Sequence, residues 1–253
     1  MLSFFLMITV CILLKDGART LAETLDSVRS FNEIIVLDNG STDESKKIAT
    51  SYPNVRWMES SFIGFGPLRN VASALASNDW ILALDADEVI SQELLKEINA
   101  LHKDPKSVYS IPRDNYYNGK HIKGCGWYPD RVIRLYNRKE TRYSDSQVHE
   151  SVIAQKVEPL HSPILHTPFQ TTADFLAKMQ HYSTLFAKQY AGKKKSSPIK
   201  AFFHSLFAFF RSYFLRSGWR LGAEGFIISL YNSNTVYYKY LKLYEENYFN
   251  IIK

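Results

Sequence analysis

Mostly apolar runs and helical patterns alternate along the first hundred residues. The apolar runs have the length and character of strands that are buried on both faces of a parallel sheet. They cover residues 5–14, 33–37, 55–59 and 80–84. Helices are expected between and after them, at residues 20–30, from Ser41 onward, at 64–76 and at 91–102. Strands and helices that alternate at this spacing predict an α/β fold with a sheet built from βαβ units.

Three short sequences mark expected helix starts. Each has a Ser or Thr followed three residues later by an acidic residue, the pattern of a capping box. They are Thr20 with Glu23, Ser41 with Glu44, and Thr171 with Asp174.

The pattern changes after residue 107. Short β-like runs appear at 108–111 and 132–136, with an Asn-Gly turn signal at residues 118–119. From Thr171 onward the chain reads as three helices. We therefore predict a mixed sheet that completes one catalytic domain over residues 1–170, followed by a helical extension over residues 171–253.

Charge divides the chain at the same place. Residues 1–170 hold 19 Lys and Arg against 21 Asp and Glu, whereas residues 171–253 hold 12 against 4. The extension is also aromatic, because 16 of the 36 Phe, Tyr and Trp lie after residue 197. A basic and aromatic helical segment favours an anionic lipid surface or a nucleic acid as partner. The apolar N-terminus lacks a basic n-region and a small-residue cleavage site, so it is interpreted as a buried strand rather than a signal peptide.

Polar residues follow three of the predicted strands. The first strand is followed by Lys15, the second ends at Asp38, and the fourth ends at Asp85 and Asp87. In a parallel sheet these strand ends share one rim, where α/β proteins bind ligands. An acidic residue there can accept hydrogen bonds from a ribose or a base, and two neighbouring carboxylates suit a divalent cation on a diphosphate.

Two further residues, Arg69 and Asn70, stand on the helix before the fourth strand and are expected at the same rim. No glycine-rich phosphate loop follows the first strand. A metal ion would therefore neutralise most of the diphosphate charge. A strand end followed by an acidic helix turn would also explain Asp85 and Asp87 without a ligand.

Several ordered motifs resemble the inverting family 2 glycosyltransferases of GT-A fold. They are D-N-G-S-T-D at 38–43, G-F-G at 64–66 with Arg69 and Asn70, and D-A-D-E at 85–88. Further motifs are similar to the WaaE/KdtX-type branch, the β-glucosyltransferases of the lipopolysaccharide inner core. They are G-W-Y-P-D at 126–130, R-L-Y at 134–136 and V-H-E at 148–150. The resemblance covers about residues 8 to 250.

The resemblance implies a UDP-sugar donor, a Mg²⁺ or Mn²⁺ ion and inversion at the anomeric carbon. Donor-binding residues would be Lys15, Asp38, Arg69, Asn70 and Asp85, with Asp38 on the uridine. Asp87, with Asp85, would serve the metal and the diphosphate. Two loops depart from the usual pattern: D-N-G replaces D-S-G at residue 38, and K-D-G replaces K-N-E at residue 15, which leaves the role of Asp16 open.

The catalytic base has three candidates. An inverting displacement needs a group on the acceptor side that takes the hydroxyl proton. Glu150 is favoured over Asp130, and His149 is third. Each has a structural alternative, such as an ion pair of Asp130 with Arg131 or Arg134. Trp127, Tyr128 and His149 are expected in the acceptor pocket, although Trp and Tyr are more often core residues.

Taken together, these patterns predict a metal-dependent hexosyltransferase. It would move glucose from UDP-glucose onto a lipid-linked saccharide such as the lipopolysaccharide inner core, at the inner face of the cytoplasmic membrane and without a nucleic-acid partner. The helical extension would either pack on the domain or bind anionic lipid as a peripheral membrane segment. Two alternatives stay open: a sugar nucleotidyltransferase, and a non-catalytic basic protein that binds membranes or nucleic acid.

Overall fold

The computed structural model describes residues 7–145 and 150–252. The chain forms two compact units. The first, here called the sheet unit, comprises Met1–Asp114 and Asp130–His166, and the second, the helical unit, comprises Asn115–Pro129 and Thr167–Lys253. The division at residues 170/171 made from the sequence did not anticipate that residues 115–129 belong with the helices.

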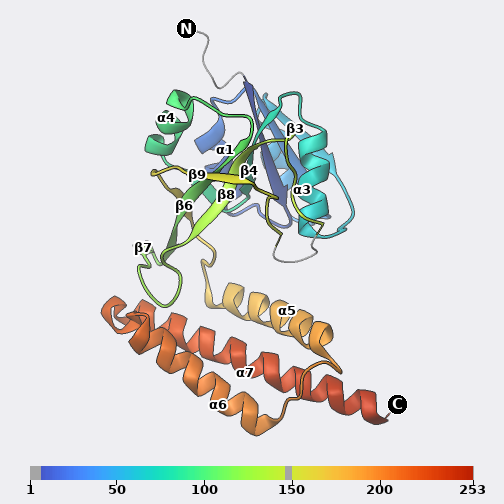
Figure 1. The fold of residues 1–253 in the computed structure, drawn as a ribbon, viewed down its shortest axis with the longest axis vertical. Coiled ribbons are helices and arrows are strands. Elements are labelled where there is room, and N and C mark those ends of the chain that lie inside the picture. The colour runs from blue at the N-terminus through green and yellow to red at the C-terminus, as the bar shows by residue number, and fades with distance from the viewer. Residues whose placement is uncertain (1–6, 146–149, 253) are drawn as a thin grey trace. The chain divides into compact units, whose positions relative to one another are not determined.

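A mixed sheet forms the centre of the sheet unit (Figure 1). Its strands run in the spatial order β3-β2-β1-β4-β8-β6-β10-β5, and β9 pairs with β6. Their bounds are β1 Ile8–Leu14, β2 Glu33–Asp38, β3 Val55–Glu59, β4 Trp80–Asp85, β5 Glu88–Ile90, β6 Ser107–Tyr117, β8 Arg131–Asn137, β9 Lys156–Pro159 and β10 Ile164–His166. The pairs among β1, β2, β3 and β4 are parallel, whereas β8 is antiparallel to both β4 and β6. The mixed α/β fold predicted from the sequence is confirmed.

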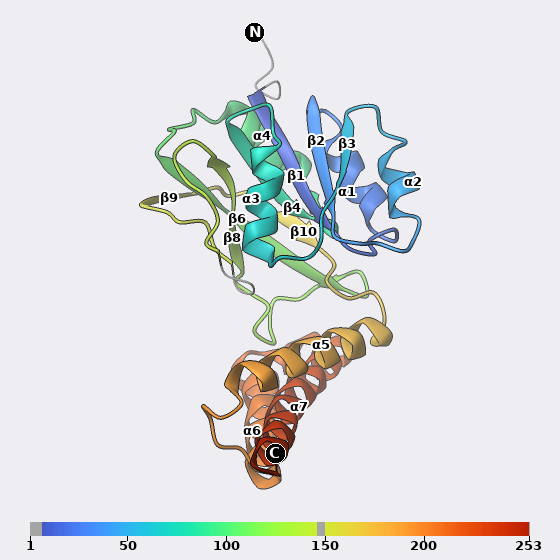
Figure 2. The same ribbon diagram turned by 90° about the vertical axis from the view of Figure 1, so that its right-hand side faces the viewer.

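Helices cover both faces of this sheet. They are α1 Leu21–Val28, α2 Ser45–Ala49, α3 Phe65–Ala74 and α4 Gln92–Ala100. Side chains that alternate along β1 divide between two cores: Val10, Ile12 and Leu14 pack with α1 and α4, whereas Cys11 and Leu13 pack with α3. Figure 2 shows α3 on one side of the strands and α1 and α2 on the other. Burial on both faces explains why these strands are continuously apolar.

Only one of the three predicted capping boxes forms. Thr171 accepts a hydrogen bond from the backbone of Asp174, and the Asp174 side chain returns the contact. Thr20 precedes α1 but makes no side-chain cap. Ser41 does not cap a helix. Its hydroxyl donates a hydrogen bond to Asp38 within the loop that follows β2. The helix caps predicted at Thr20 and at Ser41 are therefore wrong.

Three helices dominate the helical unit. They are α5 Thr172–Tyr190, α6 Pro198–Phe210 and α7 Ala223–Ile252; a π-helical turn, Arg211–Leu215, and a 3₁₀ turn, Gly218–Leu221, connect the last two. The unit also holds the strand β7, Lys120–His121. Its core joins the 115–129 segment to the helices through Tyr117, Ile122, Cys125, Phe169, Phe175, Leu221 and Ile228. Among the described residues, none of the helices has both the length and the apolar character required to span a membrane.

Candidate active site at the carboxyl ends of the parallel strands

Two predicted site carboxylates flank the end of β1. Asp38 pairs in register with Leu14 on one side of the strand, and Asp85 pairs with Leu13 on the other. The structure thus brings the ends of β2 and β4 to one rim, as parallel pairing requires. This placement follows from the sheet topology, because β1 lies between β2 and β4 and is parallel to both, so all three strands end at the same edge.

Asp38 is buried and organises the loop that follows β2. Its carboxylate accepts hydrogen bonds from the backbone N–H groups of Gly40 (3.2 Å) and Ser41 (3.0 Å) and from the Ser41 hydroxyl. Lys15 donates from Nζ to the Gly40 carbonyl at 2.8 Å. Gly40 has φ of 100°, a backbone conformation that favours glycine. Through these contacts, Asp38 and Lys15 both hold the loop after β2 in place.

The loop after β1 is joined to the loop after β2. Asp16 accepts a 2.7 Å hydrogen bond from the backbone of Thr42, and its own N–H donates to the Ser41 hydroxyl at 2.7 Å. Asp43 accepts from the Ala18 N–H at 2.9 Å. Asp16, whose role the sequence left open, therefore connects the two loops. Two loops that fix each other in this way offer a rigid edge to a ligand.

Asp85 lies between two buried arginines. Arg69 donates from Nη2 to Oδ1 at 2.6 Å, and Arg134 donates from Nη2 to Oδ2 at 2.5 Å. Burial alone would raise the pKa of Asp85, but the charges of Arg134 and Arg69, with smaller contributions from His166 and Arg113, hold it well below its usual range. Asp85 in turn raises the pKa of both Arg69 and Arg134 against the effect of their burial. Asp85 is thus held as an anion with each oxygen paired.

Glu88 and Arg113 extend this network towards Asp130. Its fully buried carboxylate accepts from Arg134 at 2.6 Å, from Arg113 at 3.0 Å and from the Asp85 backbone at 3.0 Å. Arg113 also donates from Nε to Asp130 at 2.8 Å. The predicted ion pair of Asp130 is therefore present, but with Arg113 as the partner. The sequence did not single out Arg113, and it named Glu88 only as part of the D-A-D-E motif.

Asp87 lies beside a histidine that sequence reasoning missed. Nε2 of His166 is 3.5 Å from Oδ2 of Asp87, and their side chains are 11% and 27% exposed. His166 ends β10, which pairs with β5 directly after the acidic motif. The available signal was the short apolar run at 164–165 that ends in a histidine, the same pattern of strand and polar end that identified Asp38. A run of two residues is too short for that signal to be read.

The charges of this cluster do not balance. Five carboxylates face three guanidiniums, so the formal charge is −2 when His166 is counted as neutral. The carboxylates belong to Asp85, Asp87, Glu88, Asp130 and Glu150, and the guanidiniums to Arg69, Arg113 and Arg134. A divalent cation would restore neutrality, and carboxylate oxygens are its preferred ligands.

The described part of the chain has no ready cage of three His, Cys, Asp or Glu side chains for a metal. Mg²⁺ commonly needs no such cage, because one or two carboxylates and the substrate phosphates hold it together with water. Asp87 and His166 are the side chains that fit this role, since both oxygens of Asp85 are paired with arginine. The residues present therefore fit a divalent ion that arrives with a diphosphate.

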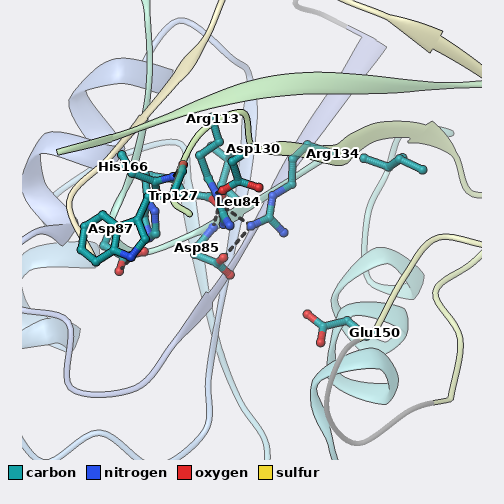
Figure 3. A network of polar contacts seen from close by, with 12 residues as sticks. Leu84, Asp85, Asp87, Arg113, Trp127, Asp130, Arg134, Glu150 and His166 are labelled. Carbon is teal, nitrogen blue, oxygen red and sulfur yellow. Dashed lines mark hydrogen bonds and ion pairs between the residues drawn. The ribbon is translucent and has the colours of Figure 1, made fainter. Parts of the chain in front are cut away.

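Glu150 occupies a different part of the rim from Asp130, as Figure 3 shows. Its Oε1 lies 3.4 Å from Nε of Arg69, and its side chain is 18% exposed. This contact is longer than the 2.8 Å contact between Arg113 and Asp130. The third candidate base, His149, lies outside the described residues.

Asn70 is engaged with the backbone of Tyr143. Its side-chain amide donates to the Tyr143 carbonyl at 3.0 Å and accepts from the Tyr143 N–H at 2.9 Å. Arg69 lies over the Tyr143 ring, 5.2 Å from its centre. Asn70 therefore positions the backbone at Tyr143, and a direct contact of Asn70 with the sugar donor stays a prediction.

The two aromatic residues predicted for the acceptor pocket belong to the helical unit and differ there. Trp127 stacks on Phe169 with ring centres 5.6 Å apart and also lies near Phe175, so it is part of a packed aromatic core. Tyr128 is 50% exposed and meets His121 edge to face. Of the two, Tyr128 is the one that presents a ring to solvent.

The glycosyl transferase family 2 model matches residues 9–158, which is more than half of the chain. The chain belongs to glycosyl transferase family 2. The matched segment contains the predicted rim and every arginine and carboxylate of the cluster. Family 2 membership establishes a glycosyltransferase, and it removes the sugar nucleotidyltransferase and the non-catalytic protein as alternatives.

Named relatives of this family 2 glycosyltransferase align along most of the chain. The lipopolysaccharide core biosynthesis glycosyltransferase LpsC of Rhizobium meliloti is 28% identical over 90% of this chain and 88% of its own. An uncharacterized glycosyltransferase of Rickettsia typhi, RT0209, is 27% identical over 88% of this chain and 82% of its own. Among solved structures, Staphylococcus aureus TarS 1–349 in complex with UDP-GlcNAc aligns with 96% of this chain and 89% of that chain, at 16% identity and a TM-score of 0.49.

Proposed function

We propose that this glycosyltransferase moves a hexose, glucose from UDP-glucose, onto a lipid-linked saccharide of the lipopolysaccharide inner core. The observation that carries the proposal is the cluster of five carboxylates and three arginines at the sheet rim, with a formal charge of −2. Such a cluster accommodates a cation and a diphosphate together. The name of LpsC, which aligns along nearly the whole chain, supports a saccharide of the lipopolysaccharide core as acceptor.

The donor would lie along the loops after β1 and β2. The Asp38 loop and Lys15 would hold the uridine end, because their backbone and side-chain contacts keep this edge rigid. Arg69 and Asp85 would act behind the diphosphate, where Arg69 keeps Asp85 anionic. Asn70 supports this end of the site through Tyr143.

Asp87, with His166 beside it, would hold Mg²⁺ or Mn²⁺. When bound, the ion neutralises the diphosphate and stabilises UDP as a leaving group. Asp85 was predicted as a second ligand, but we propose a supporting role for it, since Arg69 and Arg134 occupy both of its oxygens. Glu88 and Arg134 keep the backbone of the motif in place.

Glu150 is the proposed catalytic base. Its carboxylate would accept the proton of the acceptor hydroxyl while that oxygen forms a bond to the anomeric carbon. The bond from that carbon to the diphosphate oxygen breaks on the opposite side, its electron pair leaves with UDP, and the configuration inverts. Asp130 suits this role less, because its carboxylate is already engaged in a 2.8 Å ion pair with Arg113.

An acceptor with a lipid tail places the reaction at a membrane surface. We propose that the enzyme binds peripherally to the inner face of the cytoplasmic membrane. Tyr128, whose ring is 50% exposed, and Trp127, which stacks on Phe169, stay candidate acceptor contacts by sequence. His149 stays a candidate acceptor contact by sequence alone.

Calorimetric titration tests the donor site. The full chain would be titrated with UDP, UDP-glucose and other nucleotide sugars in Mn²⁺, in Mg²⁺ and in EDTA. We expect metal-dependent binding of UDP-glucose that Asp87→Asn abolishes and that Asp79→Asn, a change at an exposed carboxylate, leaves intact. Binding that ignores both EDTA and Asp87→Asn would contradict the metal assignment, and no nucleotide binding at all would contradict the proposed function.

A further inference from the structure

The helix α6 turns small residues towards its neighbours. Ala201 and Ala208 are buried on it, and Ser212 is buried on the π-helical turn that follows. Ser212 accepts a 3.1 Å hydrogen bond from Ser229 of α7, and the carbonyl of Ser205 accepts one of 2.8 Å from Ser233 of α7. Figure 1 shows α6 running along α7. The most buried positions on the packed side are therefore Ala and Ser, and His204 and Phe209 flank them with ring contacts to Tyr240 and Phe226 of α7.

Most of the large apolar side chains of α6 and of the π-helical turn that follows it are exposed. Six of them, here called the α6 apolar face, are each between 47% and 62% exposed. They are Phe202, Phe203, Leu206, Phe207, Phe210 and Phe214. A patch of neighbouring aromatic and aliphatic side chains on this scale is unusual on a monomeric protein in water.

This arrangement is the reverse of an ordinary surface helix. In water, the hydrophobic effect places Phe and Leu inside and leaves small and polar residues outside. Close packing through Ala and Ser, with bulky apolar residues facing away, is the arrangement of helices whose surroundings are as apolar as their side chains. The contacts of α6 therefore indicate that its outer face meets lipid.

Charge around this face identifies the kind of lipid. Residues 175–223 contain nine Lys and Arg and no Asp or Glu. Lys200, Arg211, Arg216 and Arg220, next to the face in the chain, are exposed. Trp219 is 55% exposed, and the Arg220 guanidinium lies 5.4 Å from its ring centre. Exposed Trp beside Arg and Lys is typical of the headgroup region of a membrane.

We propose that the α6 apolar face lies in the plane of an anionic phospholipid surface, as an in-plane anchor that does not span the bilayer. The surrounding cations would contact lipid phosphates while the six apolar side chains enter the acyl boundary. A second copy of the chain is a poorer occupant, because it would bring two cationic rims together without any acidic residue from this segment. The inference rests on the proposed function for the lipid-linked nature of the acceptor.

A single labelled cysteine tests the orientation. Leu206 and Leu176 are matched controls for each other, because they are 54% and 55% exposed and lie on α6 and α5. The native Cys11 and Cys125 are buried, so Leu206→Cys or Leu176→Cys in the full chain can be labelled with an environment-sensitive fluorophore. Vesicles of phosphatidylcholine with about 30% phosphatidylglycerol should shift the emission of the probe at 206 to the blue, and brominated lipid should quench it. An equal response at both positions, or none at 206, would overturn the assignment to α6.

A charge on the face tests the energetics. Leu206→Glu with Phe207→Glu should weaken binding of the full chain to these vesicles at least tenfold, whereas Leu176→Glu should not. Neutral phosphatidylcholine vesicles should bind the unchanged protein more weakly than anionic ones. Equal binding to both vesicle types would contradict the anionic surface. Unchanged vesicle binding of the double variant would overturn the inference. So would an unchanged protein that forms a dimer and does not bind vesicles, if the double variant is a monomer.

Nucleotide titration separates this inference from the proposed function. The double variant should bind UDP-glucose as the unchanged protein does, which also shows that it is folded. Vesicle binding without nucleotide binding in the unchanged chain would leave the membrane anchor standing and contradict the donor site. Nucleotide binding without vesicle binding would do the opposite.

Discussion

The rim of the sheet unit and the outer face of α6 depart from the usual distribution of side chains in opposite directions. At the rim, Glu88, Arg69 and Arg134 are charged and buried. On α6 and the π-helical turn after it, the six large residues of the α6 apolar face are exposed, while Ala201 and Ala208 are buried. Charges normally stay in water and aromatic rings normally leave it. Each departure costs free energy, and we propose that a ligand offsets part of that cost in each region.

The difference between the two regions lies in what would offset that cost. Buried charges tolerate their position because ion pairs at 2.5 to 3.0 Å satisfy them within the protein, and the divalent cation that we propose would offset the excess of carboxylates. Exposed apolar side chains have no such internal partner and need an apolar surrounding. Substitutions at the rim should therefore change the stability of the fold and the catalytic rate, whereas substitutions on α6 should change only the binding of the protein to a membrane.

The largest expected effect separates the two carboxylates of the rim. Glu150→Gln removes the proposed base and should lower kcat by roughly 10²–10⁴ with little change in KM for UDP-glucose, since general base catalysis contributes on that order. Asp130→Asn should lower it far less, because Arg113 already holds Asp130 in an ion pair. Steady-state kinetics with a lipid-linked acceptor measures both. A larger loss in the Asp130 variant would reverse the assignment.

The next effect concerns stability at the rim. Arg134→Met removes the cation shared by the buried Glu88 and the half-buried Asp85, and should lower the free energy of unfolding by about 3–5 kcal/mol. The control is Arg142→Met, where the ion pair with Asp145 is exposed and the expected loss is at most about 1 kcal/mol. Urea denaturation followed by circular dichroism gives both values. Equal losses in the two variants would contradict the expectation that the buried ion pairs of the rim contribute more to stability than an exposed ion pair.

Acid should act on the rim through Asp85. The pKa of Asp85 is lower in the folded chain than its ordinary value, because burial is outweighed by Arg134 and Arg69. The folded state thus binds fewer protons at this group than the unfolded state, so its stabilisation is complete above the ordinary carboxyl pKa of about 3.9 and is lost as pH falls below it. Asp85→Asn should flatten the fall in unfolding free energy between about pH 5 and pH 3. A variant with the same acid slope as the unchanged protein would contradict this contribution.

On α6, a substitution should change the binding of the protein to vesicles without changing its free energy of unfolding. Phe207→Gln should alter the free energy of unfolding by less than about 0.5 kcal/mol, because the ring is 57% exposed. Its binding to anionic vesicles should nevertheless weaken severalfold. Thermal unfolding without lipid and vesicle sedimentation provide the two measurements. A strong loss of stability would mean that the ring packs within the protein and that the comparison fails.

The smallest effect distinguishes a formed cap from an expected one. Thr171→Ala removes a capping box that the structure contains and should cost about 1 kcal/mol. Thr20→Ala changes a residue that makes no cap and should cost less than half of that. Denaturation curves of the two variants would show the difference. Equal costs would indicate that Thr20 caps α1 in solution.

The sequence by itself determined the α/β class, the positions of β1 to β4 and the shared rim. Continuous apolar runs are local signals, and parallel pairing then brings Asp38 and Asp85 to one edge whatever the details of packing. The family 2 motifs were also readable, because they occur in order along the chain. Local signals failed where a residue had two possible partners, as Ser41 did between a helix cap and Asp38.

Only the tertiary structure decided which charges meet and which face of α6 is exposed. His166 reaches Asp87 through the pairing of β10 with β5, and Arg113 bridges Glu88 and Asp130 from β6; both are contacts between distant segments. On α6, apolar residues surround the whole helix in the sequence, so periodicity could not select a face. Packing of Ala201 and Ala208 selected it, because close approach of two helices requires small side chains and leaves the large ones outside.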